Sequence, residues 1–92
     1  NLMPQAIVDP AELRRFANNL KRFIGDLQDG MSTMHGQVSA LGDTWRDQEH
    51  DKFREEFDQT MQVLARFIRV AEEHVPFLLR KAERIEEYLQ QR

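Results

Sequence analysis

The stretch Leu41-Gly42-Asp43-Thr44-Trp45-Arg46-Asp47 lies in the middle of a 92-residue chain and decides its fold. Apolar residues recur every three or four positions before and after this stretch, and the pattern stops within it. Gly42 can supply the end of one helix, and Asp43, Thr44 or Asp47 can cap the next. A connection this short makes the two helices antiparallel neighbours. We therefore expect a helical hairpin with Trp45 in its turn.

The first helix is predicted over residues 10–42 and begins with a strong start signal, Asp9-Pro10-Ala11-Glu12. Asp is a good N-cap, and Pro fits the first helical position. Apolar residues then alternate in steps of four and three, the spacing of a heptad seam. This seam consists of Leu13, Ala17, Leu20, Ile24, Leu27, Met31, Met34, Val38 and Leu41. Phe16 and Phe23 widen the seam, and Gly30 falls in line with them, where it could allow a close helix approach.

The second helix is predicted over residues 47–91 and carries a seam of the same spacing. That seam consists of Phe57, Met61, Leu64, Ile68, Ala71, Val75, Leu78, Ala82, Ile85 and Leu89. Pro76 lies inside it and removes the hydrogen bond to the carbonyl of Glu72. Because the seam keeps its phase across Pro76 and no good N-cap precedes it, we expect a kink near Pro76 and no third helix. Residues 1–92 then form a single all-α domain.

A second apolar stripe runs along the second helix beside its seam. One neighbouring helix covers one narrow seam, so a helix with two adjacent seams needs two neighbours. The chain itself supplies only one. We therefore expect two hairpins, either two identical copies or paralogous chains, to pair into a four-helix bundle. The predicted interface residues are Phe53, Val63, Phe67, Val70, His74 and Phe77.

The composition argues against several classes of partner. The net charge is −3 and there is no cysteine. No basic stripe suits nucleic acid, and no apolar run approaches the roughly 20 residues of a membrane span. The lack of cysteine excludes disulfides and thiolate metal sites. No cationic segment followed by an apolar run begins the sequence, so we do not expect the general secretory route.

The candidate groups for catalysis do not form a known pattern. Metal sites in helical bundles use pairs of Glu-x-x-His, and the nearest match is Asp47-x-x-His50 at the turn. The other histidines, His35 and His74, border the seams and are expected to be structural. We therefore predict no cofactor, no metal and no enzymatic activity, and a protein that works by binding.

Trp45 is the only tryptophan of the chain. It can seal the end of the hairpin as a hydrophobic plug. It can also serve recognition, because large aromatic side chains dominate binding surfaces. The sequence leaves both roles open. Residues 43–58 carry more acids than bases, which we interpret as a solubilising field at this end.

A helical hairpin of this length with a central tryptophan turn resembles the W-x-G family of small type VII (ESX) secretion substrates. The resemblance covers essentially the whole chain. Trp45 matches the family's tryptophan, but Asp47 stands where the glycine belongs. The family's export signal is a tyrosine followed four residues later by an acid. Tyr88 matches the tyrosine, whereas Arg92 occupies the acidic position.

The resemblance implies a hairpin that dimerises, folds in the cytoplasm and is then secreted through a type VII-like system. It also implies a secretion ATPase as a further partner, which would engage the turn at Trp45 and the tail of the second helix. The alternative hypothesis is a structural or adaptor bundle that stays in the cytoplasm and binds a larger protein.

Overall fold

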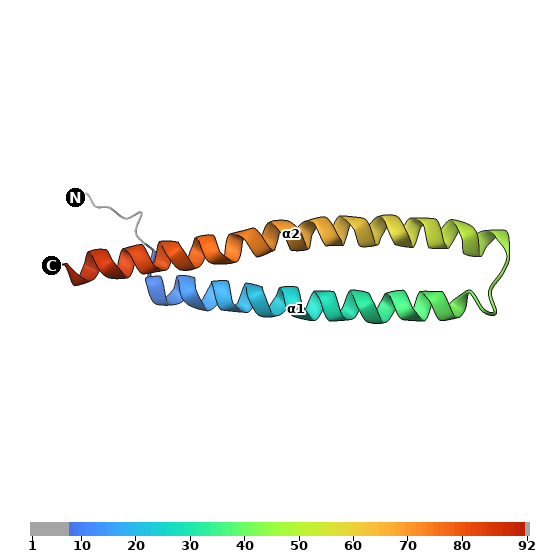
Figure 1. Cartoon of the computed structure of the whole chain (residues 1–92), viewed down its shortest axis with the longest axis horizontal. Helices are drawn as coiled ribbons and strands as arrows, with labels where there is room; N and C mark the ends of the chain where they lie inside the picture. Colours follow the sequence, from blue (N-terminus) through green and yellow to red (C-terminus); the bar gives the residue numbers. More distant parts are fainter. Residues whose placement is uncertain (1–7, 92) are drawn as a thin grey trace.

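The computed structural model describes residues 8–91, which form two long helices, α1 (Pro10–Leu41) and α2 (Gln48–Gln90). The two lie side by side and run in opposite directions, joined by the turn of residues 42–47 (Figure 1). The described residues contain no strand. The predicted all-α hairpin is confirmed, with every helix end within one residue of its expected position. We call the end with the connection the turn end, and the other the open end.

The start of α1 follows from its first residues. The side chain of Asp9 accepts a hydrogen bond from the backbone N–H of Ala11 at 2.9 Å, and Pro10 occupies the first helical position. This satisfies one of the backbone donors that a helix leaves free at its N-terminus. The predicted N-cap at Asp9 is confirmed.

The core is the contact between the two heptad seams. The buried hydrophobic residues of the described chain all fall on the predicted seams: Ala17, Ile24, Val38, Ile68, Ala71, Val75 and Ala82. Ile24 packs with Ile68, Ala71 and Val75 at the centre of this contact. Three of the seven are alanines, and no large side chain of residues 8–91 is fully buried. The hairpin therefore has a thin core.

The helix α2 continues through Pro76 without a break. Its ribbon bends gently in the orange stretch of Figure 1, and no third helix forms. A mid-helix proline removes one backbone hydrogen bond, but the seam contacts on both sides of it hold the same helix against α1. The expectation that no third helix forms is confirmed, and the predicted kink takes the form of this gentle bend.

The shape of the molecule leaves most of both helices uncovered. Its extents are 68 × 21 × 14 Å, and its radius of gyration is 20.6 Å. A compact domain of this length has a radius of gyration of about 12 Å. Two helices in contact form one layer, so each broad side of the pair faces outward. Any functional surface must lie on these sides or at the two ends.

Candidate functional site

The turn end is built on the last residues of α1. The backbone N–H of Trp45 donates to the carbonyl of Leu41 at 2.8 Å, which anchors the tryptophan to the end of the helix. Gly42 caps α1 with a φ of −63°, in the right-handed region. The glycine is therefore not required there for a left-handed conformation, the usual reason for glycine at a helix C-terminus. Its closest surroundings are instead the ring of His50 and the carbonyl of Ser39.

Asp47 begins α2. Its side chain accepts a hydrogen bond from the backbone N–H of His50 at 3.0 Å, and its own backbone is extended. These are the properties of an N-cap. The sequence left three candidates for this cap, Asp43, Thr44 and Asp47. In the structure the cap is Asp47. The residue that replaces the glycine of the W-x-G pattern thus has a structural role in starting the second helix.

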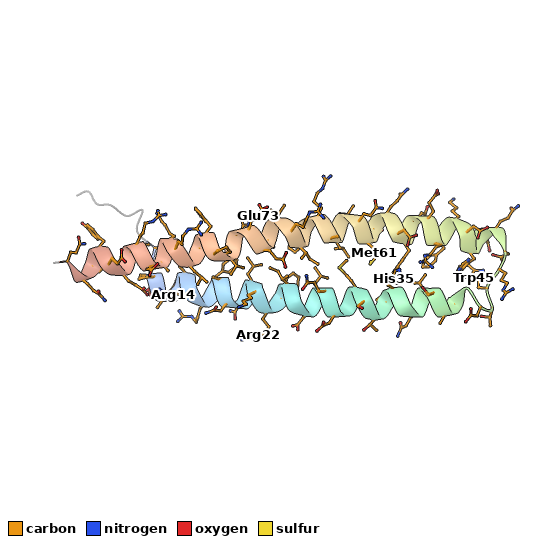
Figure 2. The ribbon with its side chains drawn as sticks, in the orientation of Figure 1. Arg14, Arg22, His35, Trp45, Met61 and Glu73 are labelled. Carbon is orange, nitrogen blue, oxygen red and sulfur yellow. The ribbon has the colours of Figure 1, made fainter. Side chains whose placement is uncertain are left out.

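Four aromatic rings, which we call the tip cluster, gather behind this cap: Trp45, His50, Phe53 and Phe57. The ring centroids of Trp45 and His50 lie 5.0 Å apart in an edge-on contact, and those of Trp45 and Phe53 lie 5.7 Å apart. Phe53 continues to Phe57 at 6.0 Å. Figure 2 shows Trp45 at the turn end of the hairpin, where it is half-buried. Trp45 therefore packs on α2 and also presents part of its ring outward.

His50 is the member of this cluster that sequence reasoning missed as a structural group. Its side chain is 14% exposed, and its Nε2 atom is buried without a hydrogen-bond partner. Its Nδ1 atom lies 3.8 Å from a carboxylate oxygen of Asp51. The signal for it was present in the sequence, since His50 stands three residues after the cap, in the first turn of α2. The sequence could not show that its ring lies against Gly42 and Trp45.

A continuous apolar surface covers one broad side of the hairpin. We call it the aromatic face and define it by Phe16 and Phe23 of α1 with Val63, Phe67, Val70, His74 and Phe77 of α2. The rings of Phe23 and Phe67 meet edge-on at 6.2 Å and join the two helices across it. Phe16, Val63 and Phe77 are more than half exposed. Large hydrophobic side chains gathered in this way mark an interaction surface.

The aromatic face is hollowed by a groove of about 460 Å³. The groove is lined by Phe16, Leu20, Phe67, Val70, Ala71, His74, Phe77 and Leu78. Four of the six predicted interface residues lie along it, and Val63 is exposed beyond it. The sixth, Phe53, lies in the tip cluster instead and is 38% exposed.

The share of α1 in this face was not predicted. Phe16 and Phe23 were expected to widen the contact between the two helices, but their side chains are 57% and 52% exposed. Gly30 continues their row in steps of seven, and no atom lies within 4 Å of the position that a Cβ would take there. Within the hairpin, Gly30 therefore mediates no close helix approach.

An ion pair between Arg14 and Glu86 links the two helices at the open end. The Nε and Nη2 atoms of Arg14 donate to the two carboxylate oxygens of Glu86 at 2.9 and 2.7 Å. These hydrogen bonds lower the pKa of Glu86 below its ordinary value of 4.5 and raise the pKa of Arg14. Figure 2 shows Arg14 near this end. Beyond the pair, Tyr88 is 61% exposed on the last turn of α2, and Arg92 lies outside the described residues.

Residues 8–91 contain no group of three histidine or acidic side chains placed to hold a metal ion. None of the described helices is long and apolar enough to cross a membrane.

A comparison with protein families decides where this hairpin belongs. The family described as proteins of 100 residues with WXG, WXG100, matches residues 5–88. The chain belongs to the WXG100 family. The predicted resemblance to the W-x-G substrates of type VII secretion is confirmed. Among curated proteins, none matches the sequence.

Solved structures agree with the WXG100 assignment. The chain is similar to EsxB, a secreted protein from Bacillus anthracis str. Sterne. A proline-to-alanine variant of EsxB matches with a TM-score of 0.80 and 30% identity, over 95% of this chain and 98% of that one. A glycine-to-alanine variant matches with a TM-score of 0.77 and 30% identity, over 94% and 99%. The wild-type protein matches with a TM-score of 0.79 and 29% identity, over 92% and 99%.

Proposed function

We propose that this protein is a non-enzymatic cargo of a type VII-like secretion system, folded in the cytoplasm and exported as a paired helical hairpin. The observation that carries the proposal is the WXG100 match over residues 5–88, which covers almost the whole chain. The similarity to EsxB, itself described as a secreted protein, supports export of this chain as well. Because the match spans both helices, the whole hairpin is the unit that the machinery would handle.

The thin core and the aromatic face support pairing with a second hairpin. A standard interface buries about 800 Å² on each partner. A broad side of the hairpin, with extents of 68 × 21 Å, is large enough to bury such an area. Two helices laid against two helices form a four-helix bundle, the arrangement that buries one broad side of each pair.

We assign the partner as a second copy of this chain. The aromatic face spans both helices, so two copies can bury the same surface against each other around a two-fold axis. The net charge of −3 is small for a chain of this length, so repulsion between identical copies is weak. A paralogous hairpin would be revealed by mixed dimers when this protein is purified from its own cells.

The two ends of the hairpin are the surfaces we assign to recognition by a secretion ATPase. Trp45 is partly exposed at the turn end, and Tyr88 is 61% exposed on the last turn of α2 at the open end. Aromatic side chains that are partly exposed on rigid helical ends provide contact area at a low cost in conformational entropy. Asp47 and Arg92 depart from the family pattern, so these two ends are where the proposal is tested.

The test is export of variants from cells that carry the native secretion system. Trp45→Ala, and a truncation after Glu87 that removes Tyr88 but keeps the Arg14–Glu86 pair, should each abolish appearance of the protein in the medium. Circular dichroism and sedimentation should show unchanged helix content and dimer mass. Gln28→Glu, on the opposite side of α1 from the aromatic face, is the control and should be exported normally.

Normal export of both changed proteins would contradict recognition through these ends. Retention of the wild-type chain in the cytoplasm of such cells would favour the alternative function, an adaptor bundle that binds a larger protein.

A further inference from the structure

The ring of His50 occupies an unusual place between the end of α1 and the indole of Trp45. A Cβ added at Gly42 would lie 3.6 Å from the Cε1 and Nε2 atoms of this ring, so the imidazole rests directly on the glycine. On its other side the ring meets Trp45 edge-on, with centroids 5.0 Å apart and an interplanar angle of 70°. The imidazole therefore acts as a spacer between helix end and indole.

The backbone on both sides of this spacer is fixed. The N–H of His50 donates to the side chain of Asp47 at 3.0 Å, which sets the first turn of α2. The N–H of Trp45 donates to the carbonyl of Leu41 at 2.8 Å, which ties the tryptophan backbone to α1. With both backbones held, the direction of the indole depends on what fills the space beside it. His50 and Phe53 are the two rings that do so.

The Nε2 atom of His50 is buried without a hydrogen-bond partner. Buried polar atoms are usually paired, so an unpaired one requires an explanation. The explanation we offer is that the imidazole supports Trp45 by its shape and not by hydrogen bonds. The space in front of Gly42 admits a flat ring, and the edge of that ring supports the indole.

We propose that His50 is a positioning residue for Trp45, which holds the indole in its partly exposed orientation at the turn end. This inference rests on the proposed function, in which Trp45 is contacted by the export machinery. Without the imidazole, the indole can fold into the space in front of Gly42 or swing away from Phe53. The export machinery then binds only those molecules in which the indole has the correct orientation. Its apparent affinity for the protein falls in proportion to the fraction of such molecules.

The single tryptophan makes the position of the indole measurable. In His50→Ala, the near-ultraviolet circular dichroism of Trp45 should weaken and its fluorescence emission maximum should move. His50→Phe keeps a flat ring of similar size and should restore both signals. His35→Ala, which removes the same side chain from an exposed position of α1, is the matched control and should change neither.

Export gives the functional readout for the same four proteins. His50→Ala should reduce export about tenfold if the competent orientation falls to roughly a tenth. His50→Phe and His35→Ala should be exported within about twofold of the wild type, while helix content and dimer mass stay unchanged. If His50→Ala lost export because it misfolds, its helix content would change. In that case His50→Phe would not restore export together with the tryptophan signal.

The possible failures are distinguishable. An unchanged tryptophan signal and normal export in His50→Ala, combined with loss of export in Trp45→Ala, would overturn the inference and leave the proposed function intact. Normal export of Trp45→Ala would contradict the proposed function itself. If His50→Phe recovered the tryptophan signal without recovering export, the polar imidazole itself would be required for export, and the positioning role would be wrong.

Discussion

Asp47 departs from the W-x-G motif, but the second helix still begins directly after it. Glycine is accepted at helix N-caps, but aspartate is better, because its side chain satisfies a free backbone donor. In this chain Asp47 caps α2 through the N–H of His50 at 3.0 Å. The departure from W-x-G therefore strengthens the start of the helix that follows the turn.

Replacing this cap has a graded effect on stability. Asp47→Ala should lower the free energy of unfolding by about 1 kcal/mol, and Asp47→Gly, which restores the family motif, by only a few tenths of a kcal/mol. Urea denaturation followed by circular dichroism, at one fixed protein concentration, measures both. Unchanged stability in Asp47→Ala would show that the aspartate side chain is not the cap.

The Arg14–Glu86 pair makes the stability of the open end depend on pH. The arginine lowers the pKa of Glu86, so the folded state favours the carboxylate more than the unfolded state does. The resulting stabilisation is complete above the unfolded value of 4.5 and is lost as the pH falls through the lower folded value. Glu86→Gln should remove this part of the acid dependence and leave the rest. Amide hydrogen exchange of the last turns of α2, compared on the two sides of this range, detects it locally.

Both helices could be predicted closely from the sequence because their signals are local. The cap Asp9-Pro10 and the steps of three and four residues are read directly along the chain, and the helix ends fall within one residue of the predicted ranges. The membership of the aromatic face was less predictable. Whether Phe23 lies between the helices or outside them depends on how each helix is rotated, which spacing alone leaves undetermined.

The same limit explains why His50 was missed. Its place in the first turn of α2 follows from the cap, but its contact with Gly42 depends on the path of a short turn in three dimensions. Trp45, in contrast, was correctly placed in the turn, while its two expected roles, plug and recognition, could not be separated. The structure shows a half-buried ring, which is compatible with both.

Alanine substitutions at the glycines of α1 distinguish effects on helix stability from effects on association between hairpins. No atom lies within 4 Å of a Cβ built at Gly25, Gly30 or Gly36. Alanine at Gly25 or Gly36 should therefore raise the free energy of unfolding by about 0.5–1 kcal/mol. Thermal and urea unfolding measure this gain.

Gly30 differs because it continues the row of Phe16 and Phe23. Gly30→Ala should gain the same helix stability but weaken association, since a methyl group would occupy space that we assign to the second copy. Sedimentation equilibrium of the three alanine variants tests this difference. Association unchanged in all three would place the interface away from Gly30.

For the whole molecule, the main consequence of the fold is that one hairpin cannot cover its own apolar surface. A charge in the centre of the aromatic face should break the dimer. Phe67→Glu should weaken association about a hundredfold or more, because an unpaired buried charge costs several kcal/mol. Gln28→Glu adds the same charge on the opposite side of α1 and should leave association unchanged.

The most direct test of this account is sedimentation equilibrium of the wild-type chain at micromolar concentration. The method reports mass without reference to shape, which matters for a molecule 68 Å long. The aromatic face predicts the mass of two chains, falling to that of one chain in Phe67→Glu. A wild-type protein that sediments as a stable single chain at this concentration would contradict the claim that the hairpin must pair.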